Sequence, residues 1–184
     1  MSRTELRISG FGGQGVILSG MIIGKAAAIF DNKHATMIQA FGPEARGSAC
    51  SAQLSISEEP IRYPYIHRPD ILIALNQDAY TRFEPELKDD GLLIYEEDLV
   101  DLRPDQRPTI RTCGIPATRI AEELGRKIVL NIVMVGFFTA VTGLISPEAI
   151  REAVRDTVPA GTEEFNLAAL EKGLRHGMNV SANT

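Results

Sequence analysis

The residues best suited to binding chemistry form a glycine-rich segment near the N-terminus. Gly10, Gly12 and Gly15 stand in the spacing Gly-x-Gly-x-x-Gly, and Gly13 and Gln14 complete the segment. Glycines permit a tight turn, and the free N–H groups at the start of a following helix attract an anion. The spacing has the form of a dinucleotide fingerprint, so it predicts a turn that can approach a phosphate-bearing ligand.

A dinucleotide site needs one more residue, which this sequence does not supply. An Asp or Glu at the end of the second strand normally holds the ribose hydroxyls. Here the second strand is predicted over residues 35–42, it ends in Gln-Ala-Phe-Gly, and the first acid beyond it is Glu44. A stand-alone NAD(P)- or FAD-dependent oxidoreductase is therefore only the alternative hypothesis. The glycines either just let a strand and a helix pack closely, or they form a loop that faces a partner chain or the anionic part of a ligand held mainly by another subunit.

Two charged or polar side chains near this turn have two interpretations each. Arg46 follows the second predicted strand, near the carboxyl edge of the sheet where α/β proteins place ligands, and its guanidinium could clamp a carboxylate or a phosphate. It could equally form an ion pair with Glu44, or with an acid of a partner, that fixes the loop. Gln14 could donate its amide to a partner or ligand, or it could cap its own turn.

The sequence offers no ligand set for a metal or a cluster. Its two cysteines, Cys50 and Cys113, lie far apart, whereas an iron–sulfur cluster takes four thiolates and a structural zinc site takes four Cys or His ligands. No serine or cysteine has a readable histidine relay, so we predict neither a catalytic nor a metal-binding residue, and we predict that Cys50 is a small buried residue. Two lone thiols with no recognisable signal peptide are typical of a reducing cytoplasm.

Hydrophobic periodicity predicts that strands and helices alternate. The predicted strands cover residues 6–9, 35–42, 49–57, 70–76, 91–100 and 109–116. The predicted helices cover residues 16–30, 77–87, 146–154 and 165–178, and a further helix from Ala117 breaks at Gly125 before an apolar segment. Such alternation is typical of a mostly parallel sheet with right-handed crossovers. We expect one α/β domain over residues 1–184, a Rossmann-like three-layer fold with C-terminal helices.

Charge and hydropathy disfavour two classes of partner. The net charge is −5 without a block of Lys and Arg, which disfavours nucleic acid. The apolar segment 128–144 contains Asn131 and falls short of the roughly 20 apolar residues that a membrane span needs. We predict a buried or interface helix in which Asn131 hydrogen-bonds a neighbouring backbone or subunit, because an unpaired buried amide costs about 1–3 kcal/mol. With the apolar helix 16–30, it gives more apolar surface than a small monomer readily covers, which predicts a partner.

Two loop segments, taken together, resemble those of a known protein family. GFGGQG (10–15), taken with GPEARGS (42–48), resembles the gamma subunit, or gamma domain, of the 2-oxoacid:ferredoxin oxidoreductases. The resemblance continues through PDILIALNQDAY (69–80), GLLIYEEDLV (91–100) and the helix around Asn131, so it covers nearly the whole chain. It is closest to the 2-oxoglutarate or general 2-oxoacid branch, and pyruvate, ketoisovalerate and indolepyruvate enzymes have related subunits. One departure is Ser48, where many relatives have a second glycine, which leaves the shape of that loop open.

The resemblance implies a division of labour among subunits. The family converts a 2-oxoacid and coenzyme A into an acyl-CoA and CO2, and passes two electrons to ferredoxin. It implies thiamine diphosphate, Mg and iron–sulfur clusters on partner subunits, namely alpha, beta and in some enzymes delta, with ferredoxin reached through the complex. The isolated chain is then expected to bind no cofactor and to be inactive. Its partner- or ligand-facing loops would contain Gly12, Gly13, Gln14, Gly15, Glu44 and Arg46, with Arg46 a candidate for a CoA phosphate.

Overall fold

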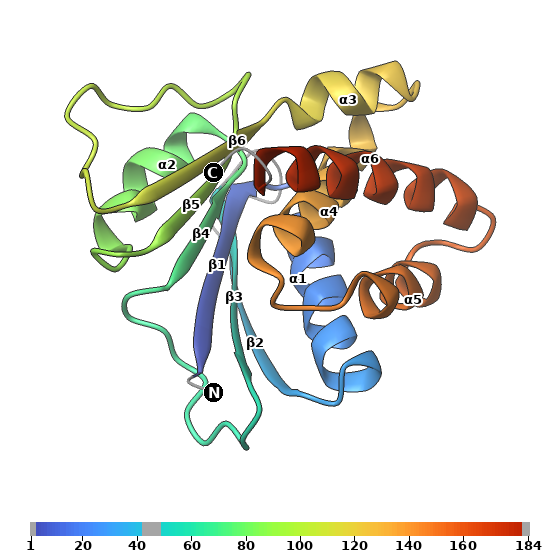
Figure 1. Ribbon diagram of the computed structural model, residues 1–184, viewed down its shortest axis with the longest axis horizontal. Coiled ribbons are helices and arrows are strands. Elements are labelled where there is room, and N and C mark those ends of the chain that lie inside the picture. Colours follow the sequence, from blue (N-terminus) through green and yellow to red (C-terminus); the bar gives the residue numbers. More distant parts are fainter. Residues whose placement is uncertain (1–2, 42–48, 182–184) are drawn as a thin grey trace.

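The chain folds around a six-stranded sheet, as the computed structural model in Figure 1 shows. The structure describes residues 3–41 and 49–181. The strands, in chain order, are β1 (Thr4–Phe11), β2 (His34–Phe41), β3 (Ala49–Ser57), β4 (Ile71–Ala74), β5 (Leu92–Glu96) and β6 (Arg111–Ile115). Their spatial order is β2-β3-β1-β4-β5-β6. The first strand of the chain, β1, therefore lies in the middle of the sheet, between β3 and β4.

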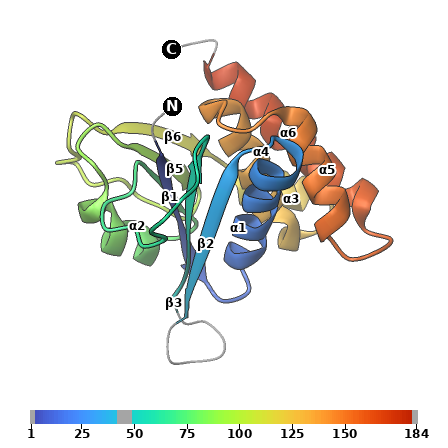
Figure 2. The ribbon, with the colours of Figure 1, turned by 90° about the horizontal axis from the view of Figure 1, so that it is seen from below.

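The helices form one thick layer and one thin layer. They are α1 (Val16–Lys25) with the π-helical segment η1 (Ala26–Phe30), α2 (Gln77–Phe83) with the 3-10 segment η2 (Glu84–Glu86), α3 (Ala117–Glu123), the 3-10 segment η3 (Lys127–Val129), α4 (Leu130–Thr142), α5 (Pro147–Thr157) and α6 (Glu163–Ser181). α2 lies on one face of the sheet, and α1, α4, α5 and α6 lie on the other (Figure 2). The predicted three-layer α/β fold with C-terminal helices is confirmed.

Only one strand runs against the rest of the sheet. β1 pairs in parallel with β4, β4 with β5, and β5 with β6, whereas β3 is antiparallel to both β1 and β2. The β2–β3 connection is residues 42–48, which is too short for the crossover that a parallel pair needs, of roughly a dozen residues or more. These two strands therefore form a hairpin, and the predicted mostly parallel sheet is correct with β3 as the exception.

Local signals in the sequence place several helix ends. The Oγ of Ser146 accepts a hydrogen bond from the Ala149 N–H, and Pro147 occupies the first helical position of α5. Pro85 lies in η2, where the α-helical hydrogen bonding of α2 stops. Gly125 has φ +97°, in the left-handed region, and it separates α3 from η3 as predicted.

The core lies on both faces of the parallel strands. All four residues of β4 are buried, which is the pattern of a strand covered on two sides. On the α1 and α4 side a large apolar cluster joins strand residues such as Leu54 and Ile94 to Phe137 and Phe138 of α4. On the α2 side a smaller cluster surrounds Tyr80. The sheet therefore positions its carboxyl edge between two packed layers, at the point where the predicted loops emerge.

The predicted apolar helices differ in how completely the chain covers them. In α4 the residues from Asn131 to Thr139 are all buried, so this segment is a core helix. In α1 and η1, by contrast, Met21 and Ile29 are exposed to 49% and 59%. Within the described residues no helix is long and apolar enough to cross a membrane. α1 and η1 thus expose apolar surface that could contact a partner, whereas the Asn131–Thr139 segment of α4 does not.

Candidate functional site

The glycine-rich segment lies at the carboxyl edge of the sheet. It joins the end of β1 to the start of α1, as the sequence predicted. The carboxyl end of β4 pairs beside β1, and its next residues lead through Asn76 into α2. On the other side of β1, Gly10 and Phe11 pair with Cys50 and Ala49 at the start of β3. Four chain segments therefore meet around one turn.

Backbone geometry explains two of the glycines in the turn. Gly13 has φ +99° and Gly15, the residue before α1, has φ +75°, so both lie where residues with a Cβ are strained. The Gln14 N–H closes the turn by donating to the Phe11 carbonyl over 3.0 Å. Gly12 and Gly13 are exposed, and a Cβ added to Gly13 would meet nothing within 4 Å. We call Gly12 and Gly13 the glycine crest, because they are the open part of the turn.

The side chain of Gln14 ties this turn to the neighbouring strand. Its Oε1 accepts hydrogen bonds from the Phe11 N–H and from Nδ2 of Asn76, both over 2.7 Å. Its Nε2 donates to the Leu75 carbonyl over 3.2 Å. Asn76 in turn accepts from the Ala79 N–H through its own Oδ1, over 2.9 Å, and so caps α2. Of the two interpretations of Gln14, these bonds describe a cap of its own turn, and a contact with ligand or partner stays a prediction.

The first and last glycines of the turn make room for side chains of the same chain. A Cβ on Gly10 would lie 2.7 Å from Oε1 of Gln14, and a Cβ on Gly15 would lie 2.5 Å from Cγ of Asn131. Nδ2 of Asn131 donates to the Gly15 carbonyl over 3.5 Å. Asn131 is buried, so the prediction that it hydrogen-bonds a neighbouring backbone is confirmed. Close packing therefore accounts for Gly10 and Gly15, and it leaves the glycine crest open.

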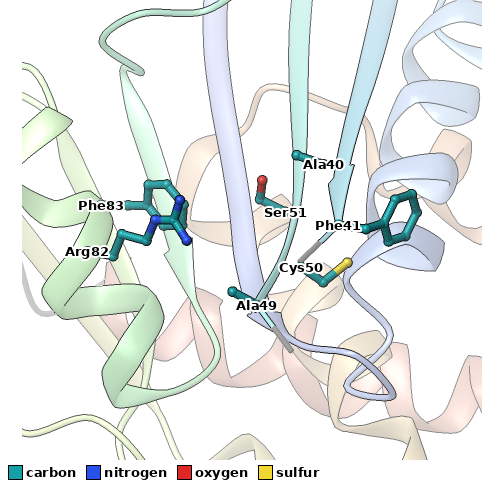
Figure 3. Close-up of a pocket in the computed structure, with 7 residues that line it drawn as sticks. All are labelled: Ala40, Phe41, Ala49, Cys50, Ser51, Arg82 and Phe83. Atoms are coloured by element: carbon teal, nitrogen blue, oxygen red, sulfur yellow. The ribbon is translucent and has the colours of Figure 1, made fainter. Parts of the chain in front are cut away.

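A cleft opens between this turn and α2. It has a volume of about 320 Å³ and its lining includes Ser9, Gly10, Asn76, Asp78 and Arg82. A second hollow of about 250 Å³ continues it toward the β2–β3 hairpin; it is lined by Ala40, Phe41, Ala49, Cys50, Ser51, Arg82 and Phe83 (Figure 3). The two hollows share Ala49, Arg82 and Phe83, so we treat them as one feature, the carboxyl-edge cleft.

The two walls of the cleft differ in chemistry. Figure 3 shows Arg82 and Phe83 reaching from α2 toward the strands, with Ser51 opposite them. The side chains of Phe41 and Cys50 lie on the α1 side of the strands instead. One wall is thus a cationic and aromatic helix face, and the other is a strand surface with small side chains.

The helical side of the cleft carries an exposed arginine, Arg82. The guanidinium of Arg82 lies 5.1 Å from the Phe83 ring centroid, and the guanidinium of Arg7 lies 4.5 Å from it. Arg7 is buried and forms an ion pair with Glu86, whereas Arg82 is exposed and has no ion pair among the described residues. Arg82 can therefore offer its full hydrogen-bonding fork to an anion in the cleft, with Asp78 the only carboxylate in the described lining.

Cys50, in the lining of the cleft, is a buried thiol. Cys50 is 6% exposed, which confirms the prediction of a small buried residue, and its carbonyl accepts a hydrogen bond from Oγ of Ser9 over 3.1 Å. Burial raises the pKa of the Cys50 thiol, and burial also raises that of Cys113. Both therefore hold their protons at neutral pH, and a protonated thiol is a poor nucleophile and a poor metal ligand.

The other predicted site residues lie outside the described part of the chain. Glu44 and Arg46 belong to residues 42–48, which join Phe41 to Ala49. Since both of these end residues line the carboxyl-edge cleft, the sequence connects the second predicted loop directly to it. Sequence reasoning did not single out Arg82, and it considered Ser51 only as a nucleophile, for which no histidine relay is readable. The available signal was the strand–Asn–helix sequence before Arg82, which places a helix start at the same sheet edge as the glycine turn.

The described residues show no ligand set for a metal. No group of three or more His, Cys, Asp or Glu side chains within residues 3–41 and 49–181 is placed to hold an ion. Cys50 and Cys113 could provide at most two thiolates, half of what a cluster takes. The chemistry of this region is therefore that of an anion-accepting, partly apolar cleft next to exposed backbone.

Comparison with known proteins identifies the family. Residues 5–176 match the model of the family described as pyruvate ferredoxin/flavodoxin oxidoreductase. The chain belongs to this family. It is 48% identical over 172 residues to the 2-oxoglutarate synthase subunit KorC of Methanocaldococcus jannaschii, covering 93% of this chain and 92% of that protein. Subunits of ketoisovalerate and pyruvate oxidoreductases also match, at lower identity.

Solved structures agree with this assignment. The gamma subunit of a keto/oxoacid ferredoxin oxidoreductase from Geobacter sulfurreducens is 36% identical and superposes with a TM-score of 0.87, over 97% of this chain and 98% of that one. The 2-oxoglutarate:ferredoxin oxidoreductase of Magnetococcus marinus, solved with 2-oxoglutarate, coenzyme A and succinyl-CoA, is 25% identical with a TM-score of 0.86, over 96% of this chain and 31% of that one. The predicted gamma subunit of a 2-oxoacid:ferredoxin oxidoreductase is confirmed, and the chain works with partner subunits.

Proposed function

We propose that this chain is the gamma subunit of a 2-oxoglutarate:ferredoxin oxidoreductase. The complex would convert 2-oxoglutarate and coenzyme A into succinyl-CoA and CO2 and pass two electrons to ferredoxin. The choice of 2-oxoglutarate is supported by the 48% identity to a 2-oxoglutarate synthase subunit, which exceeds the 36% and 35% to the ketoisovalerate and pyruvate subunits. Substrate contacts on this chain are not needed for the proposal, since the 2-oxoacid would react on a partner.

The iron–sulfur clusters do not fit the cysteines of this chain, and together with thiamine diphosphate and Mg they would belong to alpha, beta and, where present, delta subunits. Two cysteines supply at most two of the four thiolates that a cluster takes, and no group of three or more His, Cys, Asp or Glu side chains among the described residues is placed to hold a metal ion. Cys50 and Cys113, both free, also suit a reducing cytoplasm. The role left to the gamma subunit is to bind partners and to shape the route by which coenzyme A reaches the cofactor.

The carboxyl-edge cleft is the part of the chain best suited to that role. Its helical wall carries Arg82, a cation without a described acid partner, which matches a phosphate or another anionic group of coenzyme A. The glycine crest offers bare backbone beside it. The loops that we propose to surround the bound coenzyme A or the partner contain Gly12, Gly13, Gln14, Gly15, Glu44 and Arg46.

Exposed apolar side chains near the same edge supply a surface for a partner subunit. Phe41, at the carboxyl end of β2, is 68% exposed, and Ile128, three residues before the Asn131 that contacts Gly15, is 73% exposed. Leu99, beyond the end of β5, is 41% exposed. Exposed large apolar groups are typical of a surface that binds another protein. The single observation that carries the proposal is this cleft, which has on its helical wall Arg82, a residue with no ion pair among the described residues, and in its lining the exposed Phe41.

The test is reconstitution with the neighbouring subunits. The complete complex should reduce ferredoxin with 2-oxoglutarate and coenzyme A, and omission of this chain should abolish or strongly reduce that activity. Within the complex, Arg82→Ala should raise the KM for coenzyme A about tenfold, since loss of one charge-assisted contact costs ~1.4 kcal/mol, with the KM for 2-oxoglutarate unchanged. Arg62→Ala, at an exposed arginine outside the cleft, is the matched control. Full activity without this chain would refute the proposal.

The alternative, a stand-alone NAD(P)- or FAD-dependent oxidoreductase, is tested on the purified chain. Titration with NADH, NADPH and FAD should give no saturable binding, because the end of β2 supplies no acidic residue for the ribose hydroxyls. Binding of any of the three at micromolar concentration would favour the alternative over the subunit role.

A further inference from the structure

Two amides connect the two walls of the carboxyl-edge cleft. Gln14 belongs to the glycine turn and Asn76 belongs to the start of α2, and Oε1 of Gln14 accepts the Nδ2 proton of Asn76 over 2.7 Å. The same Oε1 accepts the Phe11 N–H, while Nε2 of Gln14 donates to the Leu75 carbonyl. The Gln14 end of this link is thus bonded to the backbone at the end of its own strand and to the backbone just beyond the neighbouring strand β4.

The link is also attached to α2. Oδ1 of Asn76 accepts the Ala79 N–H and caps the first turn of the helix that carries Arg82. On the other side, the position of the turn is fixed by Asn131, whose side chain packs against Gly15. Asn76 is 6% exposed, and both of its polar groups are used within the chain. The Oδ1 and the Nδ2 of Asn76 thus each make a hydrogen bond that joins parts of the same chain.

We propose that Gln14 and Asn76 are positioning residues that hold the glycine crest and Arg82 at a fixed separation, so that the cleft is formed before its ligand arrives. This inference rests on the proposed role of the cleft in binding coenzyme A. A cleft that is already shaped loses less conformational freedom on binding, so the link acts on affinity for the cleft ligand. It does not act on the 2-oxoacid, which would react on a partner subunit.

Both amides use their donor and their acceptor in hydrogen bonds within the chain. Asn76 must donate to Gln14 through Nδ2 and accept from α2 through Oδ1, which a carboxylate cannot do at once. Asn76→Asp keeps the shape and the helix cap but removes the donor and sets a carboxylate oxygen against Oε1 of Gln14. Gln14→Glu keeps both accepted bonds but loses the donor to the Leu75 carbonyl. Asn76→Asp therefore breaks the link without opening a cavity, whereas Gln14→Glu keeps the link and loses only its attachment to Leu75.

The experiment measures steady-state kinetics of the reconstituted complex with each variant. We expect Asn76→Asp to raise the KM for coenzyme A about tenfold, with kcat and the KM for 2-oxoglutarate changed less than about twofold, the pattern of lost ground-state binding. Arg82→Ala added to Asn76→Asp should cost clearly less than it costs in the parent, because the two changes act on one contact. Asn166→Asp, which alters a buried asparagine near the start of α6, is the matched control.

Each outcome decides between the inference and the proposed function. If Arg82→Ala raises the KM for coenzyme A but Asn76→Asp does not, the positioning role is wrong and the cleft's role stands. When neither change affects that KM, the proposed role of the cleft itself is wrong. Loss of complex assembly by Asn76→Asp on gel filtration, or equal losses in kcat and both KM values, would show a merely structural role and overturn the inference.

Discussion

Replacing Gly15 by alanine separates two reasons for a glycine at the start of α1. The residue has φ +75°, and a left-handed backbone costs a residue with a Cβ about 1–2 kcal/mol. The new Cβ would also lie 2.5 Å from both Cγ and Nδ2 of Asn131, well inside ordinary contact. Overpacking of this kind costs typically about 1–3 kcal/mol. The sum predicts that Gly15→Ala lowers the free energy of unfolding by roughly 2–5 kcal/mol.

Gly13 is the matched control for this prediction. Its φ is +99° and a Cβ there would meet nothing within 4 Å, so Gly13→Ala pays for the backbone but not for a clash. We expect it to cost about 1–2 kcal/mol. Adding Asn131→Ala to Gly15→Ala removes two of the three close atoms, so the double variant should be more stable than the two single losses predict.

The assay is urea unfolding of the chain followed by circular dichroism, with thermal unfolding as a second measurement. For a chain of this size each kcal/mol corresponds to about 2–4 °C in Tm. Equal losses for Gly13→Ala and Gly15→Ala, or strict additivity of Gly15→Ala with Asn131→Ala, would refute the idea that Asn131 packs against the turn.

Two further substitutions, each followed by urea unfolding, test the close packing of α4 on α6 and the effect of the buried Glu96 carboxyl on the pH dependence of stability. Gly173→Ala should destabilise the chain by about 3 kcal/mol or more, because its Cβ would lie 2.0 Å from the Val133 carbonyl oxygen where α4 and α6 cross. The control is Gly24→Ala, whose Cβ would have its nearest contact at an ordinary 3.5 Å and which should be neutral or stabilising by up to about 1 kcal/mol. Equal losses of stability in the two variants would contradict the close crossing of α4 and α6. Burial raises the pKa of the Glu96 carboxyl, so the folded chain holds that proton more tightly than the unfolded chain, and stability should fall as the pH rises from the unfolded toward the folded pKa. Glu96→Gln keeps the acceptor for the Thr118 N–H and should remove this part of the pH dependence; an unchanged pH profile would show that Glu96 is not its source.

The local structure was largely predictable because its signals are local. The third strand was predicted at residues 49–57, which are the bounds of β3, and the cap at Ser146 and the break at Gly125 are present. Apolar alternation, a capping hydroxyl and a left-handed glycine each act through neighbours a few residues away. Helix 16–30 was less accurate: α1 ends at Lys25 and continues as a π-helical segment, for which a purely periodic pattern gives no signal.

The sequence by itself determined that this is an α/β chain with a glycine turn after its first strand, without the thiolates for a cluster or an acid for a ribose. Only the tertiary structure decided that Gly15 accommodates Asn131, 116 positions away, and that Gln14 is bonded to Asn76. It also placed Arg82 across a cleft from Ser51. The physical reason is that strand order and register bring such residues together, and these depend on burial summed over the whole sheet rather than on any local pattern.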